Sequence, residues 1–132
     1  MTLDPNDIRN MAERYAEAWS SHSPEAIASF YEEDGEISIN NGEFTVGRAA
    51  IAEMAKGFYS EFPDLVVHMD DIRTAGHNAI FVWTLEGKHS ETGNSVKVRG
   101  WEEWTLSDNI LVSSSLGRFD AMEYDRQVAE GI

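Results

Sequence analysis

Residues 95–106 constrain the fold more than any other stretch, because every second residue from Val96 onward is apolar or glycine, with one acid in that row. A period of two is typical of a β-strand with one covered face, since successive side chains point to opposite sides. On the apolar side Glu102 is the lone acid. The full row is Val96, Val98, Gly100, Glu102, Trp104 and Leu106. A carboxyl group on a covered face needs a partner or holds a raised pKa, and both conditions suit proton chemistry.

The composition predicts a single globular domain over residues 1–132. The chain has 42% hydrophobic residues and four tryptophans, enough for a core of its own. Its 24 acidic and 10 basic residues give a formal charge of −14. Such a surface repels the phosphates of nucleic acids and of anionic lipids, so we expect neither a nucleic acid nor a membrane as partner. It suits solubility, or the recruitment of cationic ligands.

The sequence also bears on the compartment. No apolar run reaches the ~18 residues that a membrane span needs. The segment from Met1 to Asn10 is polar and acidic, which argues against a secretory signal peptide. The chain has no cysteine, which excludes disulfides and thiolate metal sites. We therefore expect a cytoplasmic protein.

Three helices are predicted in the first half of the chain. Asp4 or Asn6 can cap the first helix, whose apolar positions follow helical spacing. These positions are Ile8, Met11, Ala12, Tyr15, Trp19 and His22. Ser23 can cap a second helix that runs through Tyr31 and ends in the acidic segment 32–35. The third covers about residues 48–60, before a stop at Pro63.

Strands dominate the second half. A short strand around residues 37–39 precedes the third helix, and a short helix over residues 121–130 ends the chain. Between them, Gly- or Asn-containing turns separate four longer strands, at about residues 65–74, 79–90, 95–106 and 110–120. Helices followed by a meander indicate an α+β fold. We predict a curved antiparallel or mixed sheet wrapped around three N-terminal helices as a cone, with a pocket on its concave side.

Several motifs, in their order and spacing, give the chain a resemblance to a known family. They are Phe62-Pro63-Asp64-Leu65, the segment from Trp83 to His89, Thr92-Gly93, Asp120 and Gln127. From about Ile8 to Gln127 the chain resembles the SnoaL-like polyketide cyclase branch of the nuclear transport factor 2-like superfamily. The resemblance implies a small apolar ligand, chemistry without a cofactor and a homodimer formed through the sheet. It is more specific for the fold than for a reaction.

The resemblance also suggests roles for individual residues. Asp120 stands where SnoaL-like cyclases carry an acid/base aspartate. Tyr15 and Glu102 occupy places similar to the tyrosine and protonated acid that form the oxyanion hole of ketosteroid isomerases. The general base of those isomerases would lie near residue 39, where this chain has no carboxylate. Glu102 and Asp120 also resemble the two acids of limonene-epoxide hydrolases. The arginine of that set falls near Gly100, and Arg118 replaces it only if the last strand turns it inward.

Each of these residues also has a purely structural interpretation. Asp120 can pair with Arg118 and cap the terminal helix. Glu102 can be a buried acid whose partners only satisfy it, or it can face outward in another register. Tyr15 and Trp19, one helical turn apart, can belong to the core.

The remaining candidates concern the walls of the pocket. We expect Trp19, Trp83 and Trp104 to line the pocket. His89 is either a base or a packed side chain at a strand end. The other histidines show no metal-ligand spacing, so no metal site is predicted.

Two functions follow from the sequence. The first is an enzyme that uses acid/base chemistry, without a cofactor, on a small apolar carbonyl- or epoxide-bearing compound, as a cyclase, isomerase or hydrolase. Asp120 would move the proton while Glu102 and Tyr15 stabilise an oxyanion. The second is a ligand-binding or dimerisation module without chemistry, in which Asp120 lies at the rim and caps the last helix.

Overall fold

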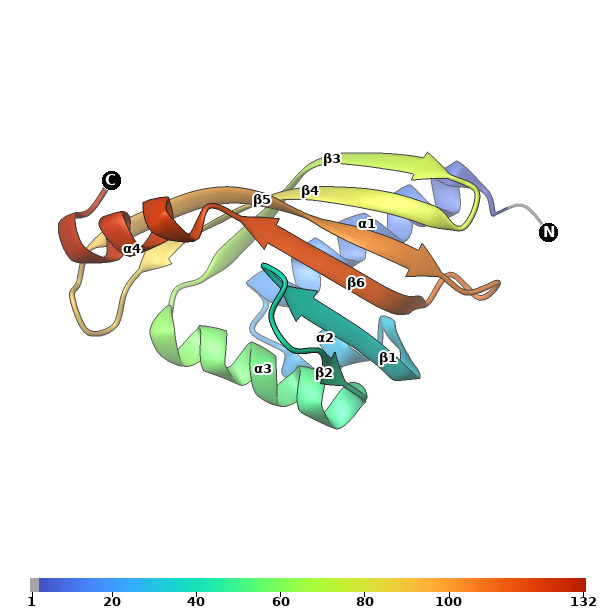
Figure 1. The fold of residues 1–132 in the computed structure, drawn as a ribbon, viewed down its shortest axis with the longest axis horizontal. Helices are drawn as coiled ribbons and strands as arrows, with labels where there is room; N and C mark the ends of the chain where they lie inside the picture. The colour runs from blue at the N-terminus through green and yellow to red at the C-terminus, as the bar shows by residue number, and fades with distance from the viewer. Residues whose placement is uncertain (1–2) are drawn as a thin grey trace.

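The computed structural model describes residues 3–132, and in this part of the chain six strands form one mixed sheet (Figure 1). The strands lie in the order β2-β1-β6-β5-β4-β3. Only β1 and β6 pair in parallel among these strands. The elements are α1 (Pro5–Ser20), α2 (Pro24–Ala28), β1 (Tyr31–Ile39), β2 (Thr45–Val46), α3 (Arg48–Glu61), β3 (Val66–Ala75), β4 (Asn78–Lys88), β5 (Ser95–Leu106), β6 (Val112–Phe119) and α4 (Ala121–Glu130). The predicted α+β fold, with N-terminal helices against a curved sheet, is confirmed.

The helices pack against different parts of the sheet. α1 packs beside β3, while α3 packs against β1 and α2. Figure 1 shows α1 crossing one face of the sheet and α4 lying at the far end, where it packs against β5. Over residues 3–132, no helix has both the length and the apolarity that crossing a membrane requires.

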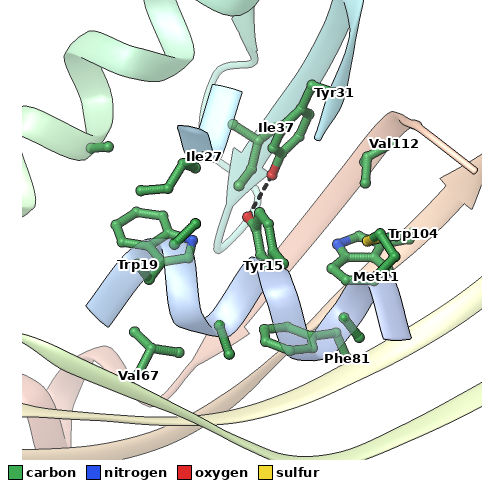
Figure 2. Packing of buried hydrophobic residues seen from close by; sticks show 14 of the residues in the cluster. Met11, Tyr15, Trp19, Ile27, Tyr31, Ile37, Val67, Phe81, Trp104 and Val112 are labelled. Carbon is green, nitrogen blue, oxygen red and sulfur yellow. Dashed lines mark hydrogen bonds between the residues drawn. The ribbon is translucent and has the colours of Figure 1, made fainter. Parts of the chain in front are cut away.

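The apolar stripe of α1 forms the centre of the core. Asp4 caps this helix, because its carboxylate accepts a hydrogen bond from the Asn6 amide at 2.8 Å. Tyr15 and Trp19 point from α1 toward the sheet, and Figure 2 shows Tyr15 reaching Tyr31 of β1. The buried residues of the stripe include Ile8, Met11, Ala12, Tyr15 and Trp19. The core therefore lies between α1 and the inner face of the sheet.

The alternation predicted for residues 95–106 is confirmed over the full length of β5. Every second residue from Val96 to Leu106 is buried, and every residue between them is exposed. Glu102 pairs with Phe81 of β4 and with Gly117 of β6. The register therefore puts Glu102 in the middle of the sheet, on its inner face.

The predicted end of the second helix is wrong. α2 ends at Ala28, and Tyr31 begins β1 instead of ending a helix. Pairing with β6 overrides the helical pattern: the Val112 amide donates to the Phe30 carbonyl at 2.9 Å, and Tyr31 pairs with Val112. The acidic segment 32–35 lies where the register of β1 shifts. Gly35 fits there because a Cβ would lie 2.8 Å from the Val112 carbonyl oxygen.

Smaller differences concern strand ends. The two-residue strand β2 was not predicted. β4 ends at Lys88 and not at residue 90, because His89 enters a turn closed by hydrogen bonds with Asn94 and Gly93. β6 begins at Val112 and not at residue 110, where Ile110 has a left-handed φ of 59°. None of these differences changes the face on which a β5 side chain lies.

Candidate functional site

A cavity of about 70 Å³ lies between the inner face of the sheet and helices α1 and α3. Its walls are apolar or aromatic apart from Glu102 and Arg118. The residues that line it are Trp19, Ile37, Ile39, Met54, Phe58, Val67, Phe81, Trp83, Glu102, Gly117, Arg118 and Phe119. An enclosed apolar cavity of roughly 150 Å³ holds benzene, so a single six-membered ring would fill this smaller, partly open cavity and extend into its opening.

Glu102 borders this cavity, and its carboxyl is held by hydrogen-bond donors from four elements. Tyr15 of α1 donates to both of its oxygens, at 3.1 Å and 3.2 Å. Three further donors reach Oε1: Ser115 at 2.8 Å, Trp104 Nε1 at 2.9 Å and Tyr31 at 3.4 Å. Over residues 3–132, Tyr15 is the one donor that reaches Oε2. Oε1 is therefore saturated, whereas Oε2 keeps capacity for a proton or a ligand.

The two phenols form a chain that ends at Glu102. The hydroxyls of Tyr15 and Tyr31 lie 2.8 Å apart, and the dashed line in Figure 2 marks this contact. Both side chains are fully buried. If Tyr31 donates to Tyr15, the Tyr15 proton is directed to Glu102, and hydrogen bonds in such a chain strengthen one another.

Burial controls the protonation of this cluster. It raises the pKa of the Glu102 carboxyl above the ordinary value of 4.5, and the hydrogen bonds from Trp104, Ser115 and the two tyrosines oppose the rise only in part. Burial, followed by the charge of Glu102, raises the pKa of Tyr15 and of Tyr31 well above 10.0. Both phenols therefore stay protonated as donors near neutral pH, and Glu102 is the group that can exchange a proton.

Asp120 lies outside this cluster. Its side chain is exposed, and its carboxylate accepts a hydrogen bond from the Glu123 amide at 3.1 Å as the N-cap of α4. It does not line the cavity. This is the capping arrangement that the sequence allowed as the alternative to a catalytic aspartate, and it places the Asp120 carboxylate outside the cavity.

The three tryptophans expected in the pocket take different positions. Trp19 and Trp83 line the cavity. Trp104 does not; it is fully buried, stacks on Phe81 with ring centroids 5.1 Å apart and donates to Glu102. Trp104 therefore supports the carboxyl and does not form a wall.

The side chains of Arg118 and His89 do not point into the pocket. Arg118 borders the cavity, but it pairs with the exposed Trp101, and paired residues share a face, so its side chain lies on the outer side of the sheet. His89 is buried against Phe62, with ring centroids 5.4 Å apart, and lies away from the cavity lining. Its Nδ1 accepts a hydrogen bond from the Glu91 amide at 3.3 Å, which fits the packed interpretation.

Sequence reasoning missed two members of the cluster. Ser115 lies two residues before Gly117 on β6, so the period of a strand would have put it on the inner face. Tyr31 had no strand period to place it on the inner face, because it was assigned to a helix. Within residues 3–132, no group of three or more histidine, cysteine, aspartate or glutamate side chains lies close enough to hold a metal ion.

Comparison with known proteins gives a family and a fold. A sequence model of the SnoaL-like domain matches residues 12–113. A search of curated proteins gives no significant match. A Jannaschia sp. CCS1 protein named after the SnoaL-like polyketide cyclases superposes with a TM-score of 0.85 at 13% identity, over 100% of this chain and 99% of that one.

Two further solved structures share the fold. A protein from Catenulispora acidiphila DSM 44928 with a ketosteroid isomerase-like fold, crystallised with trimethylamine, gives a TM-score of 0.83 at 16% identity, covering 96% of this chain and 95% of that one. The epoxide hydrolase/cyclase-like enzyme SalBIII, which takes part in pyran ring formation in salinomycin, superposes with a TM-score of 0.81 at 14% identity. The match covers 91% of this chain and 95% of that one. At these identities the likeness concerns the fold.

Proposed function

Because the chain belongs to the SnoaL-like domain family, we propose that it binds a small carbonyl- or epoxide-bearing compound and uses Glu102 as its acid/base. The observation that carries this proposal is the position of one buried carboxyl at an otherwise apolar cavity. A raised pKa lets Glu102 hold a proton at a pH where exposed carboxyls have lost theirs. Its Oε2, with Tyr15 as its one donor over residues 3–132, is the oxygen that would meet the ligand.

With either type of substrate, Glu102 ends the reaction in the protonation state in which it began. With an epoxide, protonated Glu102 gives its proton to the ring oxygen while a C–O bond breaks, and a water or an internal hydroxyl attacks the carbon. The resulting carboxylate then takes the proton of that nucleophile. With a carbonyl compound, ionised Glu102 removes a proton from the neighbouring carbon and gives it back to the oxygen or to another carbon of the enolate, so that the carboxylate is regenerated. The cyclase-type and epoxide hydrolase-type relatives support this range of reactions.

The residues around Glu102 would position it for this chemistry. Trp104 and Ser115 hold Oε1 at 2.9 Å and 2.8 Å, which fixes the plane of the carboxyl. Tyr15 can donate to the carboxylate after proton transfer and so stabilise the ionised form. Asp120 has no part in this scheme because it caps α4 in solvent.

The test is turnover of small epoxides and ketones by the wild type and by Glu102→Gln, which keeps the shape of the side chain. A positioned acid/base contributes about 10²–10⁴-fold, so turnover should fall by that factor. Glu103→Gln is the matched control, because Glu103 is exposed on the other face of β5. Full turnover by Glu102→Gln would contradict the proposal.

A second candidate function is binding without chemistry, with a small alkylated ammonium group as ligand. Aromatic walls and one carboxylate suit such a cation, and the acidic charge of the chain would attract it. The trimethylamine complex of a relative supports this candidate. Calorimetry with trimethylammonium and with tert-butyl alcohol, its neutral counterpart in shape, decides. A preference for the cation that Glu102→Gln abolishes supports this candidate, and equal binding of both compounds rejects it.

A homodimer through the outer face of the sheet belongs to the same proposal. Ile80 is 40% exposed on this face, and the half-buried Val82 lies two residues further along the same strand. Charged residues of both signs surround them, such as Asp70 and Arg99, whose side chains are 3.3 Å apart. Sedimentation of the wild type should give twice the mass of the chain, and Ile80→Glu should give the monomer. A monomeric wild type would contradict the dimer alone.

A further inference from the structure

Gly100 lies between two aromatic residues of neighbouring strands. On the inner face it pairs with Trp83 of β4 and with Phe119 of β6. The space that a side chain would fill is taken by the Arg118 carbonyl oxygen and by the Trp83 indole, because a Cβ on Gly100 would meet that oxygen and would lie 2.5 Å from Cζ2 and 2.8 Å from Cη2 of the indole. The rings of Trp83 and Phe119 approach across the glycine to a centroid distance of 6.2 Å. The indole therefore lies over the backbone of β5 and bridges toward Phe119.

This aromatic bridge stands directly beside Glu102. Trp83 and Phe119 both line the cavity, and Glu102 is two residues further along β5, or about 7 Å. On the opposite side of Glu102, the fully buried Trp104 fills the space and stacks on Phe81 at 5.1 Å. Along β5, the carboxyl is therefore enclosed between two aromatic barriers.

The two barriers differ in how firmly they are fixed. Trp104 is held by its hydrogen bond to Glu102 as well as by burial. Trp83 is only half-buried and has no side-chain hydrogen bond to residues 3–132. Its place depends on the missing side chain of Gly100. Trp83 is thus the barrier whose removal would extend the cavity without disturbing the contacts of the carboxyl.

We propose that Trp83, laid over Gly100, is the specificity-determining residue of this site and restricts it to ligands no larger than a single ring. The inference rests on the proposed function only in placing the oxygen of the ligand at Glu102. A second ring that extends along β5 from a ligand oxygen held at the carboxyl would meet the indole, because Trp83 lines the cavity and lies over Gly100. Trp83 lines this cavity of about 70 Å³, and two atoms of its indole are among the three atoms nearest to the position above Gly100; the third is the Arg118 carbonyl oxygen of the backbone.

The experiment measures binding of cyclohexanone and of the fused two-ring ketone 2-decalone by NMR titration. Trp83→Ala should raise the affinity for 2-decalone about tenfold or more relative to wild type, while cyclohexanone gains nothing. Trp101→Ala removes an indole from the outer face of the same sheet and should leave both affinities unchanged. Equal affinity of wild type and Trp83→Ala for 2-decalone, including no binding by either, would overturn the proposal.

Two further variants make the result unambiguous. If Trp83→Ala does not fold, as judged by circular dichroism, Trp83→Phe decides, with a smaller gain for 2-decalone expected and an unchanged affinity overturning the proposal. Repeating the titrations in Glu102→Gln separates the two claims. Because size exclusion needs no proton transfer, the gain for 2-decalone should persist in that background even if Glu102 proves to have no role in turnover.

Discussion

The Tyr15 hydroxyl lies 3.1 Å from one oxygen of the Glu102 carboxyl and 3.2 Å from the other. The two residues belong to α1 and to β5 and are 87 positions apart, so the contact forms only when the helix packs on the sheet. It joins a group that keeps its proton near neutral pH to one whose pKa burial has raised.

Removing either phenol hydroxyl should raise the pKa of Glu102 further, because hydrogen bonds from Tyr15 and Tyr31 act to lower it. Tyr15→Phe and Tyr31→Phe should each also cost about 1–3 kcal/mol in the free energy of unfolding, as a buried partner loses its donor. Carbon-13 NMR titration and urea unfolding measure the two effects. Tyr59→Phe is the control, since its hydroxyl donates to the Trp19 carbonyl at 2.8 Å and does not touch Glu102. A Glu102 pKa that is unchanged in both phenol variants would contradict the network.

The pH dependence of stability should carry the signature of Glu102. Its pKa is raised in the folded protein, so above 4.5 the folded state holds a proton that the unfolded chain releases. The stability that this proton provides is complete below pH 4.5 and is lost as the pH rises through the folded pKa. The free energy of unfolding of the wild type, measured relative to Glu102→Gln by urea titration, should therefore fall across that window. A difference that stays flat, or that grows with pH, would show that the folded pKa is not raised.

Asp120 offers a direct comparison between a cap and a catalyst. Asparagine caps a helix about as well as aspartate. Asp120→Asn should therefore leave both the stability of the protein and its turnover of substrate close to wild type. Asp120→Ala should cost about 1 kcal/mol because the Glu123 amide loses its acceptor. Thermal unfolding and turnover assays distinguish the two roles. Loss of turnover in a stable Asp120→Asn protein would restore the catalytic interpretation.

Gly100→Ala should destabilise the fold and displace the Trp83 indole. The new Cβ would meet the Arg118 carbonyl oxygen and two atoms of the indole ring. Overpacking of this kind typically costs about 1–3 kcal/mol. Urea unfolding measures the cost, and a change in tryptophan fluorescence reports the displaced ring. Gly76→Ala does not serve as a control because its φ of 62° strains any side chain, whereas Gly57→Ala on α3 has no atom within 4 Å and should not destabilise the protein.

The sequence was sufficient for features that depend on a regular period. Alternation along β5 placed Glu102 inside, and helical spacing placed Tyr15 on the inner side of α1, because both patterns have one buried face. Their meeting could be anticipated only from the resemblance to a family. The distances and the donors depend on how the helix packs on the sheet.

Residues at the ends of elements were harder to place. Whether Asp120 faces the pocket depends on where β6 stops, and a strand that ends at Phe119 makes Asp120 the cap of α4. Tyr31 was assigned to a helix, because local pattern cannot reveal that pairing with Val112 starts a strand there. The Trp83 indole lies over Gly100 because that residue, on the neighbouring strand β5, has no side chain.

The most direct test of the account is carbon-13 NMR titration of the glutamate side-chain carboxyls, with Glu102→Gln used to assign the signal. We predict that the Glu102 carboxyl titrates at a higher pH than the exposed glutamates and that its signal moves when cyclohexanone binds. If it titrates together with the exposed glutamates and does not respond to any ligand in the cavity, Glu102 is not the acid/base of this site.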